Sequence, residues 1–279
     1  MSHTHSAPAD TSPRRLAGEA KVAPEMIVSS VPTQLLTQDT ALDLIEAHWS
    51  TDEGRSLGVA SINLDHVHHF GERGAWHDAL GESVAWLNLI DGAPIAAKAR
   101  RLTGTRWPRL AGSDLIAPIL DRAQAGGVRV GFLGGAAPTL VKLREAVSVD
   151  WPDLAIVGTW APPREQIVDA KASKELAAEV RKAGVDLLVV CLGKPRQELW
   201  IETNAAATGA RVLLGFGAVV DFLAGEVSRA PQVVADAGVE WAWRLAQEPR
   251  RLARRYLVQA PPAYAQVQRA TVEGALRSR

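Results

Sequence analysis

The chain has 279 residues, of which 47% are hydrophobic, and its 31 basic and 31 acidic side chains balance to a formal net charge of zero. This composition suits one large or two modest globular domains with a buried core, and it excludes bulk disorder. Cys191 is the only cysteine, which excludes an intramolecular disulfide framework, and its apolar neighbours indicate a small core residue.

Residues 1–24 are expected to form a flexible N-terminal tail that is rich in Ser, Thr and Pro. The tail has no apolar segment of signal-peptide length, and no stretch of the chain reaches the roughly 20 apolar residues that a membrane span needs. A cytoplasmic protein is therefore expected. His3 and His5 are interpreted as solvated side chains rather than metal ligands.

The first folded elements are predicted to be a strand over 26–31, ended by Pro32, and an amphipathic helix over 37–49. A second strand over 57–65 carries several polar side chains at its end: Ser61, Asn63, Asp65, His66 and His68. Two histidines at positions i and i+2 are a poor zinc motif without a third ligand nearby.

Strands and helices continue to alternate along the chain. The predicted elements are a helix at 76–80, a strand at 84–90, a helix at 95–102, a helix capped by Ser113 or Asp114, a strand at 128–133, a helix at 140–147, a strand at 154–160, a helix at 170–183, a strand at 187–192, a helix from 196 and a strand at 212–217. Such alternation predicts an α/β fold whose largely parallel sheet has helices on both faces.

Asp91-Gly92 comes directly after the predicted strand 84–90. In open parallel sheets ligands bind outside the carboxyl ends of the strands, so a carboxylate at this point stands where a general base is needed. A plain Asp-Gly turn is the competing interpretation.

Gly134-Gly135 separates a predicted strand from a predicted helix. A glycine turn before a helix N-terminus can hold a phosphate through free N–H groups. The pattern is not the dinucleotide fingerprint, and taken alone it is a weak signal.

The stretch 185–200 is chemically dense. Leu187 to Leu192 is typical of a buried parallel strand, and Gly193 and Pro195 then turn the chain into a helix that begins with Arg196, Gln197 and Glu198. These polar residues lie where a substrate binds in such sheets. The alternative is an ordinary strand-to-helix turn with a capping Gln-Glu pair.

From residue 231 the pattern changes to helix only, with helices over 233–247 and 250–258 stopped by Pro249 and by Pro261-Pro262. Nine Arg stand against four acidic residues from 229 to 279. The pattern divides the chain into an α/β domain over 25–230 and an Arg-rich helical appendage over 231–279. Such a charge bias favours a phosphate-bearing partner or an anionic membrane face.

A series of motifs follows in order along the chain: Asn63, Asp91-Gly92, Gly112-Ser-Asp-Leu115, Phe132-Leu-Gly-Gly135, Pro152 to Thr159, Leu192 to Trp200, Gly215 to Phe222, Gly225 to Pro231 and Glu240 to Leu257. Together they resemble the WecG/TagA/CpsF glycosyltransferases, glycosyltransferase family 26, from about residue 26 to 257. The resemblance implies a Rossmann-like domain with a C-terminal appendage that touches the membrane and helps to complete the active site.

The activity implied by the resemblance is transfer of a sugar from a UDP-sugar to a saccharide carried on a polyprenyl diphosphate, with inversion, no metal and no cofactor. The expected setting is cell-surface or exopolysaccharide synthesis at the inner face of the cell membrane. No nucleic-acid partner is expected, and a homo-oligomer is left open.

The resemblance also implies roles for individual residues. Asp91 is expected to be the general base, and Ser61, which stands where members often have Thr, is expected to hold a sugar. Gln197 matches a donor-binding position. The other expected substrate-binding residues are Asn63, Gly92, Ser113, Asp114, Gly134, Gly135, Gly193, Glu198, Asp221 and the appendage arginines Arg244, Arg251, Arg254 and Arg255.

The chain departs from the commonest family pattern at Trp160 to Arg164 and at Ala93-Pro94, which leaves the transferred sugar open. An NAD-dependent oxidoreductase is one alternative for the fold, but the glycine fingerprint followed by an acid is missing. A non-catalytic nucleotide-binding protein is another, although it does not account for the acid at Asp91.

Overall fold

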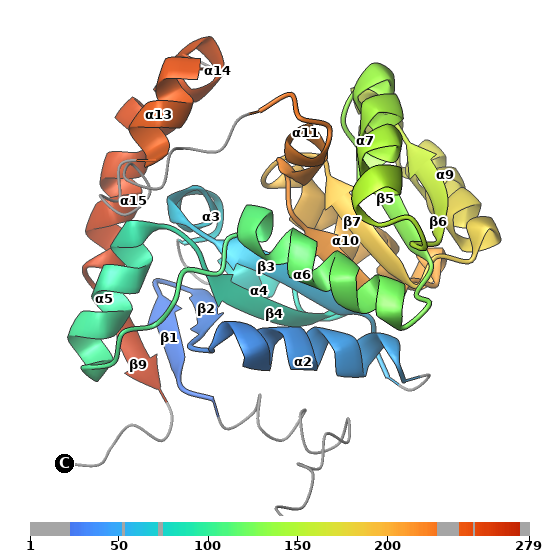
Figure 1. Cartoon of the computed structure of the whole chain (residues 1–279). Helices are drawn as coiled ribbons and strands as arrows, with labels where there is room; N and C mark the ends of the chain where they lie inside the picture. Colours follow the sequence, from blue (N-terminus) through green and yellow to red (C-terminus); the bar gives the residue numbers. More distant parts are fainter. Residues whose placement is uncertain (1–22, 52–53, 72–74, 228–239, 248, 274–279) are drawn as a thin grey trace, which may run out of the picture.

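A computed structural model gives the structure of residues 23–51, 54–71, 75–227, 240–247 and 249–273. In these ranges the strands form one nine-stranded sheet in the order β6-β5-β7-β8-β3-β4-β2-β1-β9 (Figure 1). The strands are β1 (Glu25–Val28), β2 (Val31–Gln34), β3 (Leu57–Ile62), β4 (Ala85–Ile90), β5 (Val130–Gly134), β6 (Ile156–Trp160), β7 (Leu187–Cys191), β8 (Val212–Gly215) and β9 (Thr271–Glu273).

Every strand pair from β6 across to β2 is parallel, and only the pairs β2–β1 and β1–β9 are antiparallel. The predicted α/β fold with a largely parallel sheet is therefore confirmed. The segments that follow the parallel strands therefore begin at one edge of the sheet.

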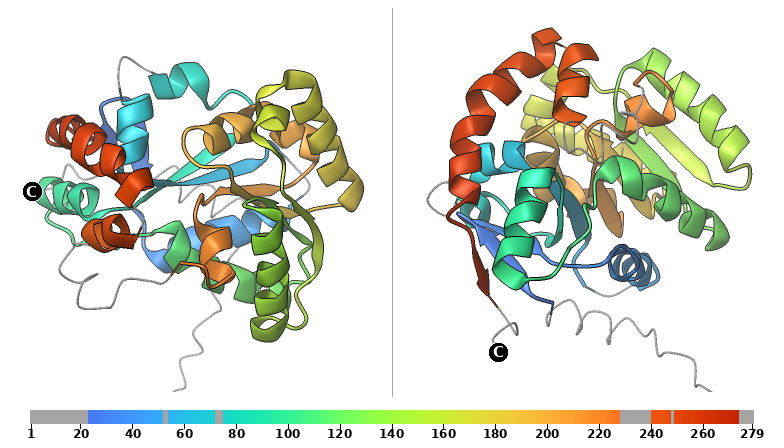
Figure 2. Two further views of the ribbon diagram at one scale, coloured as in Figure 1. Left: turned by 90° about the horizontal axis from the view of Figure 1, so that it is seen from above. Right: turned by 60° about the vertical axis from the view of Figure 1, so that its left-hand side comes forward.

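Helices cover both faces of the sheet (Figure 2). They are α2 (Gln38–Trp49), α3 (Leu64–Phe70), α4 (Ala75–Ala79), α5 (Ala93–Thr103), α6 (Gly112–Ala125), α7 (Ala137–Asp150), α8 (Arg164–Val168), α9 (Ala170–Ala183), α10 (Arg196–Thr208), α11 (Val219–Leu223), α13 (Glu240–Gln247), α14 (Pro249–Ala253), the π-helical turn η1 (Arg254–Gln259) and α15 (Ala260–Val267).

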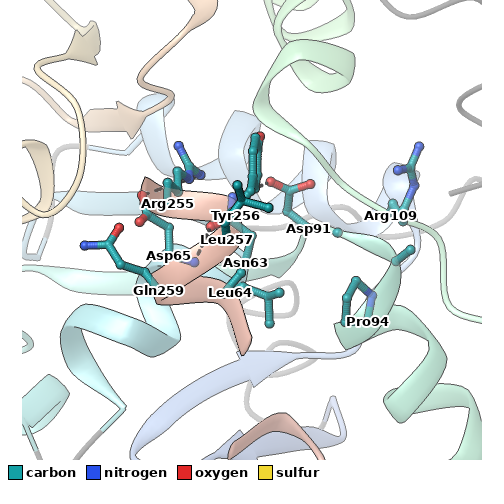
Figure 3. Close-up of a pocket in the computed structure, with 13 residues that line it drawn as sticks. Asn63, Leu64, Asp65, Asp91, Pro94, Arg109, Arg255, Tyr256, Leu257 and Gln259 are labelled. Atoms are coloured by element: carbon teal, nitrogen blue, oxygen red, sulfur yellow. Dashed lines mark hydrogen bonds and ion pairs between the residues drawn. The ribbon is translucent and has the colours of Figure 1, made fainter. Parts of the chain in front are cut away.

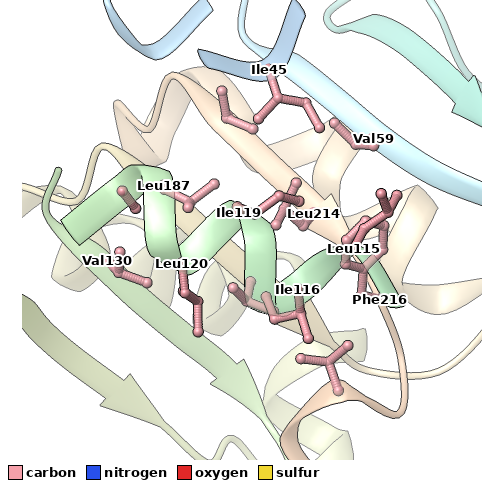
Figure 4. Packing of buried hydrophobic residues seen from close by; sticks show 14 of the residues in the cluster. Ile45, Val59, Leu115, Ile116, Ile119, Leu120, Val130, Leu187, Leu214 and Phe216 are labelled. Atoms are coloured by element: carbon pink, nitrogen blue, oxygen red, sulfur yellow. The ribbon is translucent and has the colours of Figure 1, made fainter. Parts of the chain in front are cut away.

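The largest part of the core lies between the sheet and the helices α2, α6 and α7. Ile45 and Ile119 pack there against strand residues such as Val59 and Leu214 (Figure 4). On the other face α9 and α10 cover β5, β7 and β8, whereas α3, α5 and α15 cover β3 and β4. The strands are therefore buried on both sides, which explains their nearly continuous apolar sequences.

The N-terminal end of the fold differs from the predicted single strand over 26–31. The chain turns back at Ser29 and Ser30, where Ser29 has φ of 60°, and forms a hairpin of β1 and β2. Pro32 does not end a strand but lies in β2 opposite Ile27. The polar pair Ser29-Ser30 is the turn signal that the prediction overlooked.

The C-terminal segment also differs from the predicted pattern of helix only. Pro261 does not stop a helix but lies in the first turn of α15, where a missing backbone N–H costs little. Val267 of α15 is fully buried in the core with α3 and α5, and β9 then pairs with β1. The segment after residue 231 therefore contributes to the sheet and the core.

Candidate active site

A pocket of about 290 Å³ opens at the carboxyl edge of the sheet (Figure 3). Four segments form its wall: the β3–α3 turn, the β4–α5 turn, the loop before α6, and η1 with the start of α15. The lining residues are Asn63, Leu64, Asp65, Asp91, Gly92, Ala93, Pro94, Arg109, Arg255, Tyr256, Leu257, Gln259 and Ala260.

Asn63 connects two of these segments. The predicted strand 57–65 ends earlier, at Ile62, because Asn63 is the N-cap of α3 and its side-chain oxygen accepts a hydrogen bond from the backbone N–H of Asp65 at 3.2 Å. The amide nitrogen of Asn63 then donates to Oδ2 of Asp91 at 2.9 Å. Helix capping thus sets the orientation of the amide that holds the carboxylate.

Asp91 lies directly after β4, and its own backbone N–H donates to Ile62 O at 2.8 Å. Gly92 follows with φ of 85°, a conformation that favours glycine, and the chain then enters α5. Among the described residues, Oδ1 of Asp91 accepts no hydrogen bond. One carboxylate oxygen is therefore fixed, and the other is available in the pocket.

Hydrogen bonds of the Leu110 backbone hold the loop that brings Arg109 to the pocket. The backbone N–H of Leu110 donates to Ile90 O at 2.6 Å, and its carbonyl accepts from the Ser61 hydroxyl at 3.2 Å. These two bonds hold the loop across the ends of β4 and β3. Ser61 is only 4% exposed, and its hydroxyl is directed to this loop rather than into the pocket lining.

His66 and Glu198 form a fully buried pair beneath the pocket, with Nε2 of His66 and Oε1 of Glu198 3.0 Å apart. The backbone N–H of Asn63 donates to Nδ1 of the same ring, so the proton lies on Nε2 and is donated to Glu198. Burial, followed by the positive charge of Lys194, lowers the pKa of His66 from 6.5. The ring is therefore neutral at pH 7.

Gln197 is also fully buried. Its side-chain nitrogen donates to Oε1 of Glu198 and to Gly215 O, both at 2.7 Å. The competing interpretation of a capping Gln-Glu pair is therefore wrong, because these side chains connect α10 to β8 and α3. Oε1 of Gln197 and Oε2 of Glu198 have no hydrogen-bond partner in the described part of the chain.

Lys194 lies in the turn between β7 and α10, and its ammonium group donates to Ser61 O at 3.4 Å. Burial of this group, with the positive charge of Arg255 as the second cause, lowers the pKa of Lys194 to about 8. The negative charges of Asp91, Glu198 and Asp65 oppose that shift. Lys194 does not line the pocket, but its ammonium group is close enough to Asp91, Glu198 and Asp65 for their charges to act on it.

Arg255 brings the C-terminal segment to the pocket. Its guanidinium lies 3.4 Å from Oδ2 of Asp65, where the two side chains are 26% and 9% exposed. The guanidinium also lies 5.7 Å from the ring centre of Tyr256. This ion pair joins η1 to the first turn of α3, so residues far apart in sequence share one wall (Figure 3).

The structure brings five of the expected site residues together in or directly beneath the pocket: Asn63, Asp91, Gly92, Glu198 and Arg255. Gly193 precedes Lys194 in the adjoining turn. Arg254 is exposed and does not line the pocket. The side chains of Arg244 and Arg251 lie outside the described residues.

Five other expected residues lie outside the pocket lining. Gly134 and Gly135 form the turn between β5 and α7, and Asp221 is in the first turn of α11. Ser113 and Asp114 lie inside α6 and do not cap it. That helix begins at Gly112 because the glycine packs directly on the Phe216 ring, where a side chain does not fit.

Lys194, Asp65 and Arg109 were not among the expected site residues. Lys194 stands inside the dense stretch 185–200, and Asp65 follows Asn63, so their positions after strands were a usable signal. No local signal identifies Arg109, because the loop that carries it is placed by contacts with β3 and β4.

The described residues contain no group of three or more His, Cys, Asp or Glu that is arranged to hold a metal ion. In the same part of the chain, no helix combines the length and apolar character needed to span a bilayer.

The fold is that of an α/β protein with a doubly wound sheet, and a carboxylate, two arginines and a lysine lie at the carboxyl edge of this sheet, where such proteins bind their ligands. The model of the family described as Glycosyl transferase WecG/TagA/CpsF matches residues 26–276. Because this match covers nearly the whole chain, the protein belongs to that family and is a glycosyltransferase of cell-surface polysaccharide synthesis. Membership decides against the oxidoreductase alternative and implies a sugar-nucleotide donor and a lipid-linked acceptor.

Proposed function

We propose that the protein transfers a sugar from a UDP-sugar to a saccharide on a polyprenyl diphosphate, with inversion at the anomeric carbon and without a metal. The observation that carries the proposal is the carboxylate of Asp91, which Asn63 holds through Oδ2 while Oδ1 remains available in the pocket. Asp91 is the general base in this proposal.

The reaction is a single displacement. Asp91 takes the proton of the acceptor hydroxyl through Oδ1, and the acceptor oxygen bonds to the anomeric carbon. The bond from that carbon to the diphosphate oxygen breaks on the opposite face, and UDP leaves with the bonding electrons. Attack from the opposite face inverts the anomeric configuration, and one base is sufficient for such a step.

Cationic side chains support a metal-free departure of UDP. Arg255 and Arg109 line the same pocket as Asp91. A guanidinium offers several fixed donors that match phosphate oxygens and stays charged at every physiological pH. Charge that develops on the leaving diphosphate is thereby stabilised in place.

The lipid-linked acceptor calls for contact with the inner face of the cell membrane, and η1 presents a suitable surface. Leu257 and Val258 are 62% and 63% exposed, and Tyr264 on α15 is 49% exposed. Arg254 lies beside them and is also exposed. A mixture of exposed apolar and basic side chains favours an anionic interface.

The test is a transfer assay with a panel of UDP-sugars and a short-chain prenyl-diphosphate sugar as acceptor, run with and without EDTA. We expect one donor to give a product whose anomeric configuration, determined by NMR, is opposite to that of the donor, and we expect the rate to survive EDTA. Retention of configuration would refute the single displacement. Loss of activity in EDTA, restored by magnesium or manganese, would refute the metal-free proposal.

A further inference from the structure

Lys194 occupies the centre of the sheet's carboxyl edge. It follows β7, and its ammonium group reaches Ser61 O at the end of β3. Because β8 lies between β7 and β3, the lysine side chain extends across the end of β8. Ligands of doubly wound sheets bind in the crevice outside these strand ends.

Charged groups from four elements surround this ammonium group. Asp91 follows β4, Asp65 belongs to α3, Glu198 belongs to α10, and Arg255 comes from η1. The buried ring of His66 on α3 is also within electrostatic reach. All of them influence the charge of Lys194, so the lysine is part of the site's electrostatics rather than a solvated surface residue.

The ammonium group nevertheless has few direct partners. Within the described ranges its only hydrogen bond is the 3.4 Å contact with Ser61 O, and no carboxylate lies within 4.0 Å of it. An ammonium group has three donors, and a partly buried cation is costly unless it is paired. The unused donors therefore call for an oxygen-rich anion.

The second cation, Arg255, strengthens this requirement. Its positive charge is the largest electrostatic influence that disfavours the charged form of Lys194. Two like charges held close together destabilise one another unless an anion lies between them. A diphosphate, which carries negative charge on several oxygens, would remove this repulsion.

We propose that Lys194 is a substrate-positioning residue that binds the diphosphate of the sugar-nucleotide donor at the carboxyl end of β8, next to the pocket. This assignment rests on the proposed function, because it takes a nucleoside diphosphate sugar as the donor. Lys194 then holds the diphosphate from the sheet side, while Arg255 approaches it from η1.

The proposal has a specific pH dependence. Lys194 binds an anion only when it is protonated. The affinity for the donor is therefore highest well below pH 8 and declines as the pH rises through about 8. The pKa values of His66 and His69 are lowered mainly by burial, so both rings are already neutral above pH 7. Binding of the anion raises the pKa of Lys194 and takes up a proton near pH 8.

The test measures binding of UDP, of uridine and of geranyl diphosphate to the full chain by calorimetry between pH 7.0 and 8.8. The variants are Lys194→Met, Lys194→Arg and, as a matched control, Lys174→Met, which changes an exposed lysine on α9. Circular dichroism and thermal melting check that each variant is folded. Because UDP is used without acceptor, the readout is independent of turnover.

For Lys194→Met we expect UDP affinity at pH 7.0 to fall about tenfold or more, as for one charge-assisted hydrogen bond, with uridine affinity unchanged. The wild type should lose UDP affinity by up to about tenfold per pH unit above pH 8. Lys194→Arg, which stays charged, should bind UDP with little dependence on pH. Lys174→Met should behave as the wild type.

Three results would overturn the assignment. If folded Lys194→Met bound UDP as tightly as the wild type, the lysine would not hold the donor diphosphate, and the proposed transfer would stand. If Lys194→Met weakened binding of geranyl diphosphate but not of UDP, the lysine would serve the acceptor. If the wild type bound neither UDP nor any UDP-sugar, the proposed donor would itself be wrong.

Discussion

Asn63 donates a hydrogen bond to Oδ2 of Asp91 at 2.9 Å with the same side chain that caps α3. The position of the proposed base is therefore coupled to the start of a helix. Because the side-chain oxygen of Asn63 is already bound to the backbone N–H of Asp65, the amide cannot turn its oxygen toward Asp91 without losing the cap. The arrangement keeps one carboxylate oxygen fixed and the other available.

Asp91→Asn is expected to abolish most of the turnover while the fold survives. The amide matches the carboxylate in shape and keeps an oxygen that can accept from Asn63, but it cannot take up a proton. Loss of a general base costs about 10²–10⁴ in rate. Steady-state kinetics measure the loss, and a thermal melt checks the fold. Turnover near the wild-type level would exclude Asp91 as the base.

Asn63→Ser separates the two roles of the asparagine. Serine is about as good an N-cap as asparagine, so the thermal midpoint should stay close to that of the wild type. The shorter side chain does not reach Asp91, so kcat is expected to fall by about tenfold or more because the carboxylate loses its orientation. Asn63→Ala, which also loses the cap, should be destabilised by about 1 kcal/mol. Normal kcat in Asn63→Ser would show that the amide does not position Asp91.

The lowered pKa of His66 predicts how the free energy of unfolding depends on pH. Its pKa in the folded chain is below 6.5, so the unfolded chain takes up a proton at a higher pH than the folded chain does. The contribution of His66 to the free energy of unfolding is therefore fully present above about pH 6.5 and is lost as the pH falls below that value. Urea unfolding at pH 7.5 and 5.5 should show a loss of up to about 1.4 kcal/mol from this one group. His66→Gln keeps a side chain that suits this capping position, and its loss should be smaller. An equal loss in both proteins would rule out His66 as the cause.

The exposed apolar residues of η1 predict binding to anionic vesicles. The double variant Leu257→Asp with Val258→Asp should sediment at least about tenfold less with such vesicles, because burying each large apolar side chain contributes about 1.5–3 kcal/mol. Its thermal midpoint should not change, since both side chains are largely exposed. Val149→Asp on α7, at a residue that is 78% exposed, is the matched control. If the double variant sedimented with the vesicles as the wild type does, η1 would not be the segment that contacts the membrane.

Point substitutions are preferable here to removal of the C-terminal segment. Truncation before Val233 would be informative only if the segment that follows were separate from the α/β domain. Because Ala263 and Val267 are buried with α3 and α5, and β9 belongs to the sheet, truncation would expose the core. It would not leave an intact α/β domain.

The sequence predicted those features that depend on local pattern. Apolar runs of strand length alternating with amphipathic helices defined the parallel sheet, and Asp91-Gly92 was correctly placed at the end of β4. The helix predicted over 37–49 is α2, with Thr37 as its N-cap. These signals are contained within a few neighbouring residues.

Features that depend on distant contacts were missed or misjudged. Lys194 meets Ser61 across 133 positions of sequence, and Arg255 meets Asp65 only because α15 packs on α3. The start of α6 is set by the fit of Gly112 on Phe216 rather than by a capping side chain. Pairing of β9 with β1 has no local signature, since only the completed sheet offers β1 as a partner.

The β1–β9 pairing also bears on the order of events during synthesis of the protein. The wall of the pocket that η1 supplies is followed directly by α15 and β9, and β9 is held by β1, which is made long before it. A nascent chain can assemble most of the sheet early, whereas α15 and β9, which pack on α3 and pair with β1, are made after the other described elements. We therefore expect ribosome-bound chains stalled before β9 to show no transfer, and ribosome-bound chains in which β9 has emerged to be active.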